Sequence, residues 1–248
     1  MSPQFFAAAA LLSALLAIAL EWRERRHAAF YLLKPLTTLL IIGIAASSPA
    51  GDARTFMLVA LSLSLVGDVC LMFSGNMVPE RSEVGAGAGK SDVSRSHLLT
   101  QDAVSTSAGE RWFIGGLGSF LLAHLAFIPA LLHGVVAPTL PWWSVVLVIF
   151  GIAFFAWLLP KTGALKLAVL IYGSVLTALA LAAIARWNVQ HSDASLMALV
   201  GALLFVLSDS SLSIRQFVTP YRGAQALILS TYWLAIGLMA FSVTLTTN

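Results

Sequence analysis

The chain has 248 residues, of which 59% are hydrophobic and 10% are charged, and its formal net charge is +3. A soluble domain carries about 25% charged residues, so the composition excludes an ordinary water-soluble protein, and the small net charge argues against a nucleic-acid partner. The one cysteine, Cys70, excludes an internal disulfide framework and a cysteine-rich metal site, and we interpret it as a packing residue.

Apolar stretches long enough to cross a bilayer as helices recur along the whole chain. They predict an all-α, polytopic integral membrane protein with a single transmembrane domain over residues 1–248. The first stretch has no basic residue ahead of its apolar run, since Arg23 follows it, which indicates a retained span rather than a signal peptide. The eight predicted spans are residues 3–21, 29–47, 54–74, 112–133, 142–159, 163–186, 194–217 and 224–245.

The second and third predicted spans each carry an ionisable residue. Lys34 lies in the first turns of the second span, where it either lines a site or extends its amine to the membrane surface. Asp68 lies inside the third span, near its end. The segment that follows, residues 75–111, is polar and rich in Gly and Ser, which predicts a flexible cytoplasmic loop, with a regulatory or lid segment as the alternative.

The later spans add polar residues, most of them at a similar depth. The histidine can be an ordinary hydrogen-bonded core residue, the tyrosines can belong to an interfacial belt, and the serine can bond its own helix backbone. An aspartate near a helix end can likewise reach the lipid headgroups. These residues are His124, Tyr172, Ser208, Asp209, Gln225 and Tyr232.

Two aspartates in apolar spans are harder to explain structurally, because an ionisable group in a span costs about 2.5–3.5 kcal/mol on insertion scales and is a functional candidate by default. They stand in matched settings, G-D-x-x-L at 67–71 and S-D-x-x-L at 208–212, on helices that run in the same direction. The match suggests two four-helix halves, with Asp68 and Asp209 facing each other across the bundle.

The distribution of basic residues predicts an orientation. Of the 14 Lys and Arg residues, all but Arg54 and Arg186 fall on the side of the loops that follow spans one, three, five and seven. Because positive residues stay cytoplasmic, both termini are expected outside the cytoplasm, in a membrane whose Ala- and Leu-rich spans resemble those of a bacterial inner membrane.

Two carboxylates that share a low-dielectric pocket can divide the work of acid and base, which suits hydrolysis of an acetal-like or enol-ether bond through an oxocarbenium ion. Other chemistries fit less well. A zinc site needs about three ligands, for which Asp68, Asp209 and His124 are the candidates. A serine hydrolase built on Ser208 and His124 lacks a nucleophile elbow. No metal or cofactor is expected.

The chain resembles the YhhN-like transmembrane lysoplasmalogenase family in six of its eight predicted spans. The matching stretches are LLKPLTTLLI (32–41), LSLSLVGDVCLMF (61–73), GGLGSFLLAHLAFI (115–128), LIYGSVL (170–176), GALLFVLSDSSLSI (201–214) and YRGAQALILSTYWLAIGL (221–238). Residues 75–111 depart from the family, in which this connection is usually short.

The resemblance implies an eight-helix membrane enzyme that hydrolyses the vinyl-ether bond of lysoplasmalogens to a fatty aldehyde and glycerophosphoethanolamine or glycerophosphocholine. It implies that Asp68 and Asp209 are the essential pair. It also gives a set of substrate-binding candidates, of which Lys34 is the one we expect at the lipid phosphate. Two alternatives stay open: a lipid or solute carrier with the aspartates as a proton relay, and a hydrolase of another ether or ester lysolipid. The substrate-binding candidates are Lys34, His124, Tyr172, Ser208, Gln225 and Tyr232.

Overall fold

The computed structural model describes residues 2–22, 28–74 and 92–245, and within these residues it contains eight α-helices and no strand. Short 3₁₀ turns precede and follow α5, at Trp142–Ser144, Leu159–Lys161 and Gly163–Leu165. The helices are α1 (Pro3–Trp22), α2 (Ala28–Ala46), α3 (Asp52–Phe73), α4 (Asp92–Leu132), α5 (Val145–Leu158), α6 (Lys166–Gln190), α7 (Asp193–Phe217) and α8 (Ala224–Ser242).

Seven of these helices contain apolar stretches long enough to cross a membrane, and α2 contributes the shorter apolar stretch Tyr31–Ala46. The whole of α2 has 19 residues, and a helix of that length spans about 28 Å, close to the hydrocarbon thickness of about 30 Å. The predicted all-α, multi-pass membrane fold is therefore confirmed.

The connections between helices follow local backbone chemistry. Ser192 starts α7 with a capping box, in which its hydroxyl accepts from the backbone N–H of Ser195 and the Ser195 hydroxyl accepts from that of Ser192. His191 ends α6 in the left-handed conformation at φ 45°, and Gly223 takes φ 77° before α8. These tight turns bring α6, α7 and α8 together as antiparallel neighbours.

The expected loop over 75–111 is wrong in its second part. Residues 75–91 lie outside the described residues, but the chain from Asp92 onward is helical and continues into the apolar section of α4, Gly109–Leu132. The physical reason is composition: the glycines end at Gly89, and residues 92–108 contain neither Gly nor Pro, so nothing in them interrupts a helix.

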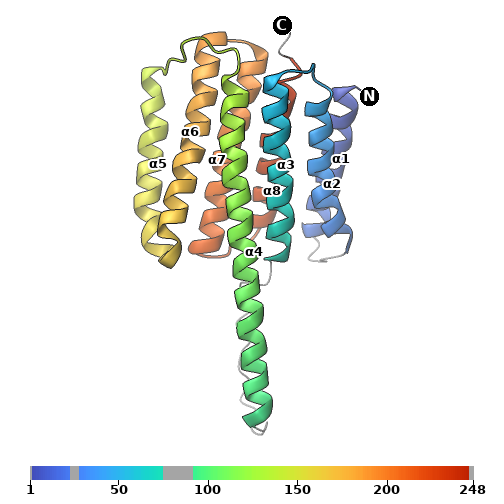
Figure 1. Cartoon of the computed structure of the whole chain (residues 1–248), viewed down its shortest axis with the longest axis vertical. Coiled ribbons are helices and arrows are strands. Elements are labelled where there is room, and N and C mark those ends of the chain that lie inside the picture. The colour runs from blue at the N-terminus through green and yellow to red at the C-terminus, as the bar shows by residue number, and fades with distance from the viewer. Residues whose placement is uncertain (1, 23–27, 75–91, 246–248) are drawn as a thin grey trace.

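Six helices pack as a closed ring in the order α2, α3, α4, α6, α7 and α8, with α8 against α2. The other two lie outside it, α1 against α2 and α8, and α5 against α6, and Figure 1 shows them at opposite edges of the bundle. In each half of the chain the first helix packs on the second from outside the ring, and the second, third and fourth helices follow one another in the ring. The packing order of α1–α4 thus resembles that of α5–α8. In this ring α3 and α7, the helices with the two aspartates, occupy opposite positions.

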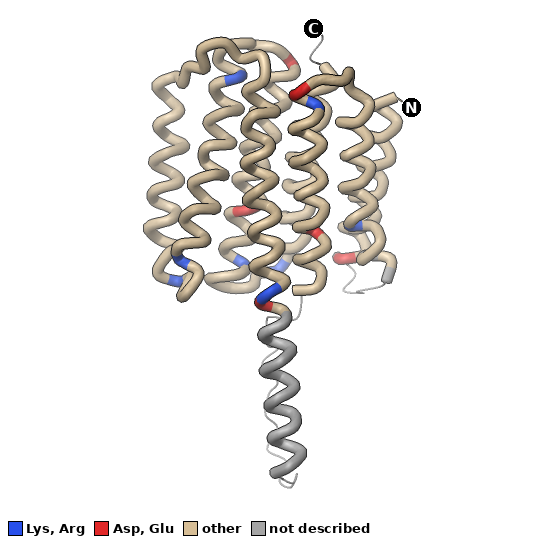
Figure 2. Tube along the Cα trace, in the orientation of Figure 1, with Lys and Arg blue, Asp and Glu red and all other residues tan. Residues whose placement is uncertain are grey.

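The two ends of the bundle differ in charge. We call the end where α1 begins and α8 ends the terminal end (Figure 1) and the opposite end the basic end. Lys and Arg gather at the basic end, as Figure 2 shows. This agrees with the predicted separation of charge, and the assignment of the basic end to the cytoplasm stays a prediction. The basic end includes Arg111, Lys161, Lys166, Arg215 and Arg222.

Fully buried apolar side chains fill the terminal half of the ring. Met57 and Leu61 lie on the turns of α3 before its buried aspartate, Phe205 lies one turn before the aspartate of α7, and Met239 lies on the last turns of α8. Phe127 closes this cluster from α4. Because this half is solid, any cavity between α3 and α7 has to open toward the basic end.

We expect Gly201→Ala to lower the stability of the bundle by about 1–3 kcal/mol, the usual cost of overpacking. A Cβ at Gly201 would stand 2.8 Å from the Ala235 carbonyl oxygen and 2.9 Å from the Met239 Cγ, so α7 and α8 would have to separate. Gly237→Ala is the matched control, because a Cβ there meets nothing within 4 Å. Thermal unfolding of the purified variants in detergent measures the difference, and equal midpoints for the two variants would contradict the close approach.

Candidate active site

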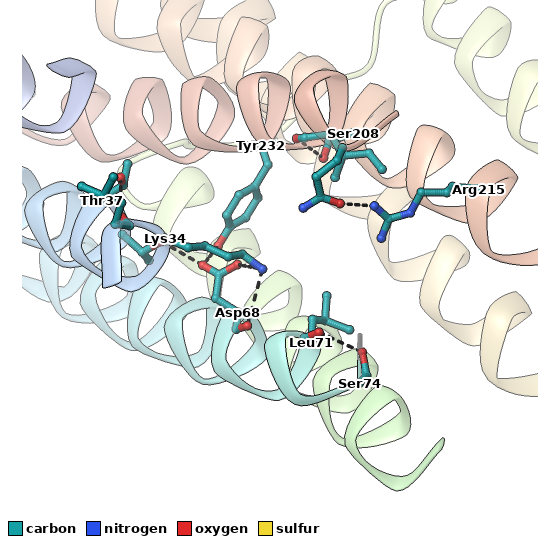
Figure 3. A network of polar contacts seen from close by, with 12 residues as sticks. Lys34, Thr37, Asp68, Leu71, Ser74, Ser208, Arg215 and Tyr232 are labelled. Carbon is teal, nitrogen blue, oxygen red and sulfur yellow. Dashed lines mark hydrogen bonds and ion pairs between the residues drawn. The ribbon is translucent and has the colours of Figure 1, made fainter. Parts of the chain in front are cut away.

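Asp68 is buried on α3, with 2% of its surface exposed, and its carboxylate is bonded from two other helices. From α2, the Lys34 Nζ lies 3.3 Å from Oδ1, and the Thr38 hydroxyl donates to Oδ2 at 2.8 Å. From α8, the Tyr232 hydroxyl donates to Oδ2 at 2.9 Å, as Figure 3 shows. Two hydroxyl donors and one opposite charge stabilise a carboxylate that apolar surroundings alone would destabilise.

The glycine of the G-D motif explains how this pocket closes. A Cβ at Gly67 would stand 2.6 Å from the Phe120 ring of α4, so only glycine lets this ring pack directly on α3. Phe120 in turn meets Tyr232 edge to face, with ring centroids 5.7 Å apart. The small residue before Asp68 therefore helps to hold the tyrosine that donates to it.

Asp209 on α7 is buried against two different helices. The Tyr172 hydroxyl of α6 donates to its Oδ2 at 2.5 Å, and the Nε2 of His124 on α4 lies 3.7 Å from the same oxygen. His124 is fully buried between the rings of Tyr172 and Phe205, and neither of its ring nitrogens has a hydrogen-bond partner among the described residues. Asp209 therefore has one hydrogen-bond donor among the described residues, and His124 lies just beyond hydrogen-bond distance.

The two aspartates are contacted from corresponding helices, but by different side chains. Asp68 of α3 is bonded from α2, which neighbours α3 in the ring, and from α8, which neighbours α7. Asp209 of α7 is contacted from α6, which neighbours α7, and from α4, which neighbours α3. The difference in charge comes from Lys34, which pairs with Asp68, whereas within the described residues Asp209 contacts a tyrosine and a histidine. The charge balance of the two carboxylates is therefore unequal.

Both carboxylates line one cavity of about 400 Å³ that lies between the helices of the ring. Its wall is partly apolar, with Leu71, Phe113 and Ile228 among the lining residues. Polar side chains at two sides of an apolar chamber are what a site for an amphiphilic molecule requires. Of the residues singled out in the sequence, Lys34, Asp68, Tyr172, Ser208, Asp209, Gln225 and Tyr232 line it.

Asp209 also borders two smaller cavities. One of about 40 Å³ lies between α5, α6 and α7, where Phe150, Phe154 and Val206 line it, and one of about 30 Å³ lies toward Phe113 and Leu117 of α4. Both have mainly apolar walls. Asp209 therefore lies where the large cavity meets the smaller apolar cavities, one of which adjoins helix α5.

The structure decides several of the alternatives left open by the sequence. Lys34 does not reach the membrane surface, because it is 6% exposed and paired with Asp68. The Tyr172 and Tyr232 hydroxyls bond the aspartates rather than an interface. Ser208 does not bond its own helix: its hydroxyl donates to the Ile228 carbonyl of α8 at 3.1 Å, which ties α7 to α8.

The sequence did not single out two residues of the site, one that bonds Asp68 and one that lines the cavity. Thr38 follows Lys34 by one helical turn, so the four-residue spacing could have placed it on the same face of α2. Arg215 lines the cavity from α7, and its Nη1 donates to the amide oxygen of Gln225 on α8. Because it lies near the end of its span, the sequence only groups it with the other basic residues of that side.

Among the described residues, no three His, Cys, Asp or Glu side chains come together as a metal site would require. The zinc alternative built on both aspartates and His124 therefore has no geometric support here, and the expectation of no cofactor stays a prediction.

A family model described as the YhhN family matches residues 29–89 and 97–243 of the chain. No curated protein and no solved structure matches the chain.

Proposed function

The chain belongs to the YhhN family, and on this basis we propose that it is a membrane lysoplasmalogenase that hydrolyses the vinyl-ether bond of lysoplasmalogens. The products are a fatty aldehyde and glycerophosphoethanolamine or glycerophosphocholine. The observation that carries the proposal is that Asp68 and Asp209, from opposite helices of the ring, line the same cavity with unequal partners.

The unequal partners support one division of the two roles. Lys34 balances the charge of Asp68, which suits a carboxylate that activates water. Asp209 contacts no Lys or Arg within the described residues, and Tyr172 donates to its Oδ2, which leaves Oδ1 to carry a proton. Asp209 is therefore the general acid in this proposal, and Asp68 is the general base.

With these roles the proton transfers of the whole reaction balance. Asp209 gives its proton to the vinyl carbon distal to the ether oxygen, and the adjacent carbon becomes part of an oxocarbenium ion. Water adds to that carbon as Asp68 takes the proton that water loses, and a hemiacetal forms. When the hemiacetal collapses, Asp68 returns a proton to the departing glycerol oxygen and Asp209 takes the proton of the hemiacetal hydroxyl. Both side chains end as they began.

The apolar surroundings of Asp209 support a lipid substrate. The cavity between α5, α6 and α7 offers a path for an alkenyl chain beyond the acid, while the headgroup stays in the large cavity. Since α5 packs mainly on α6 and most of its side chains face outward, a chain that reaches Asp209 can enter from the surrounding lipid.

Purified protein offered a panel of vinyl-ether, alkyl-ether and acyl lysolipids, with products read by mass spectrometry, tests this function. We expect aldehyde from the vinyl-ether lysolipids and no product from the alkyl-ether or acyl lysolipids. Release of fatty acid from acyl lysolipids would point to a different hydrolase. Flux in proteoliposomes without any product would point to a carrier. Either result would overturn the proposal.

A further inference from the structure

The reaction above leaves two charged side chains of the cavity without a task, Glu21 of α1 and Arg215 of α7, and Arg215 is the cation of the two. Arg215 lines the same cavity as the two aspartates and is half-buried on α7. It follows Asp209 by six residues, and the helix therefore separates the two by about 9 Å toward the basic end. Its Nη1 donates to the amide oxygen of Gln225 on α8, and Figure 3 shows Arg215 apart from the pair of Lys34 and Asp68.

Lys34 is a poor candidate for a phosphate site, although the sequence suggested it. Its Nζ lies 3.3 Å from Asp68 Oδ1 and 3.5 Å from the Asp68 carbonyl oxygen, and the residue is almost fully buried. A phosphate that took this amine would leave Asp68 buried without its counter-charge, which is costly. The anion of a substrate has to meet a different cation.

We propose that Arg215 and Gln225 form the subsite that holds the phosphate of the substrate headgroup, a proposal that rests on the function proposed above. A guanidinium presents several N–H donors in a plane and matches the oxygens of a phosphate two at a time. The Gln225 amide oxygen accepts from Nη1 and fixes the plane of the guanidinium, and the amide NH₂ group is a further donor at the same place.

The length of the substrate agrees with this position. From the ether oxygen through the glycerol carbons to phosphorus, an extended lysolipid spans about 6 Å, with bonds of about 1.5 Å. Asp209 at the vinyl ether and a guanidinium on a long side chain two turns further along α7 are compatible with that length. The headgroup then points to the basic end, and the alkenyl chain points past Asp209 to the apolar cavities.

The test compares two substrates that differ only in the phosphate headgroup: a lysoplasmalogen and the matching 1-alkenyl glycerol. We expect Arg215→Gln to raise KM for the lysoplasmalogen by roughly 10- to 100-fold, the effect of losing a charge-assisted hydrogen bond, with a smaller change in kcat. Hydrolysis of the alkenyl glycerol should be unchanged. Arg222→Gln is the control, because Arg222 is exposed at the same end of the bundle and does not line the cavity.

An equal loss on both substrates, or no loss on either, would overturn the phosphate subsite. To separate this from a failure of the hydrolase itself, binding of a non-cleavable alkyl-ether lysophosphocholine to protein in nanodiscs is measured by native mass spectrometry. Binding that weakens in Arg215→Gln and not in Arg222→Gln supports the subsite even if wild-type protein releases no aldehyde. Displacement of the lysolipid by millimolar inorganic phosphate would instead identify a site for the free ion.

Discussion

Replacing either Asp68 or Asp209 by Asn is expected to lower aldehyde release by at least about 10²–10⁴-fold, the contribution of a positioned acid or base. Asparagine keeps the shape of the side chain and can still accept from Tyr172 or Tyr232, the donors to the native carboxylates. It cannot give or take the proton that each step requires. Steady-state assays of purified variants on a vinyl-ether lysolipid measure the loss.

The controls are aspartates on the same helices. Asp52 and Asp193 lie exposed in the first turns of α3 and α7, at the terminal end of the bundle, and their change to Asn should leave activity within about twofold of wild type. Size-exclusion profiles and thermal unfolding establish that each variant folds. A folded Asp209→Asn variant with wild-type turnover would remove Asp209 from the mechanism, and the same holds for Asp68.

The positions of the helices were predictable because the thickness of the bilayer determines the length of a spanning helix. An apolar run that must cross about 30 Å has a nearly fixed length, so the predicted spans 54–74 and 194–217 differ by one or two residues at most from α3 and α7. The exception is the start of α4, where a polar sequence continues as helix. No apolar pattern marks that boundary, and the glycine-rich part before it made the whole segment resemble a loop.

The aspartates were predictable, but their partners were not. A carboxylate in an apolar span is conspicuous because of its insertion cost, and the paired G-D and S-D motifs suggested that two such residues act together. Which cation approaches which carboxylate depends on how α2 lies against α3, and spacing along the chain does not contain that contact. For this reason the sequence favours Lys34 for the lipid phosphate and does not single out Arg215.

Lys34 also makes two similar half-sites chemically different. If both aspartates had a cation beside them, neither would readily supply a proton, and if neither had one, the site would lack a stable carboxylate to activate water. Lys34 of α2 stands where the corresponding helix of the second half, α6, provides Tyr172. In the proposed mechanism, the division of labour between the two carboxylates thus follows from Lys34.

Lys34→Met should destabilise the protein by about 3–5 kcal/mol, the cost of removing one partner from a buried ion pair. The variant leaves Asp68 inside the bundle with only the Thr38 and Tyr232 hydroxyls as donors. The double variant Lys34→Met/Asp68→Asn removes both charges and should recover most of the lost stability. Unfolding by denaturing detergent in mixed micelles gives the free energies for the full double-mutant cycle.

Lys166→Met is the matched control, because Lys166 is exposed at the first residue of α6, and its loss should change stability by less than about 0.5 kcal/mol. Additive effects of the two single substitutions would mean that Lys34 and Asp68 do not interact as the 3.3 Å contact implies. The double variant has a second use, since it should fold and still release no aldehyde. It therefore separates the contribution of Asp68 to folding from its part in the reaction.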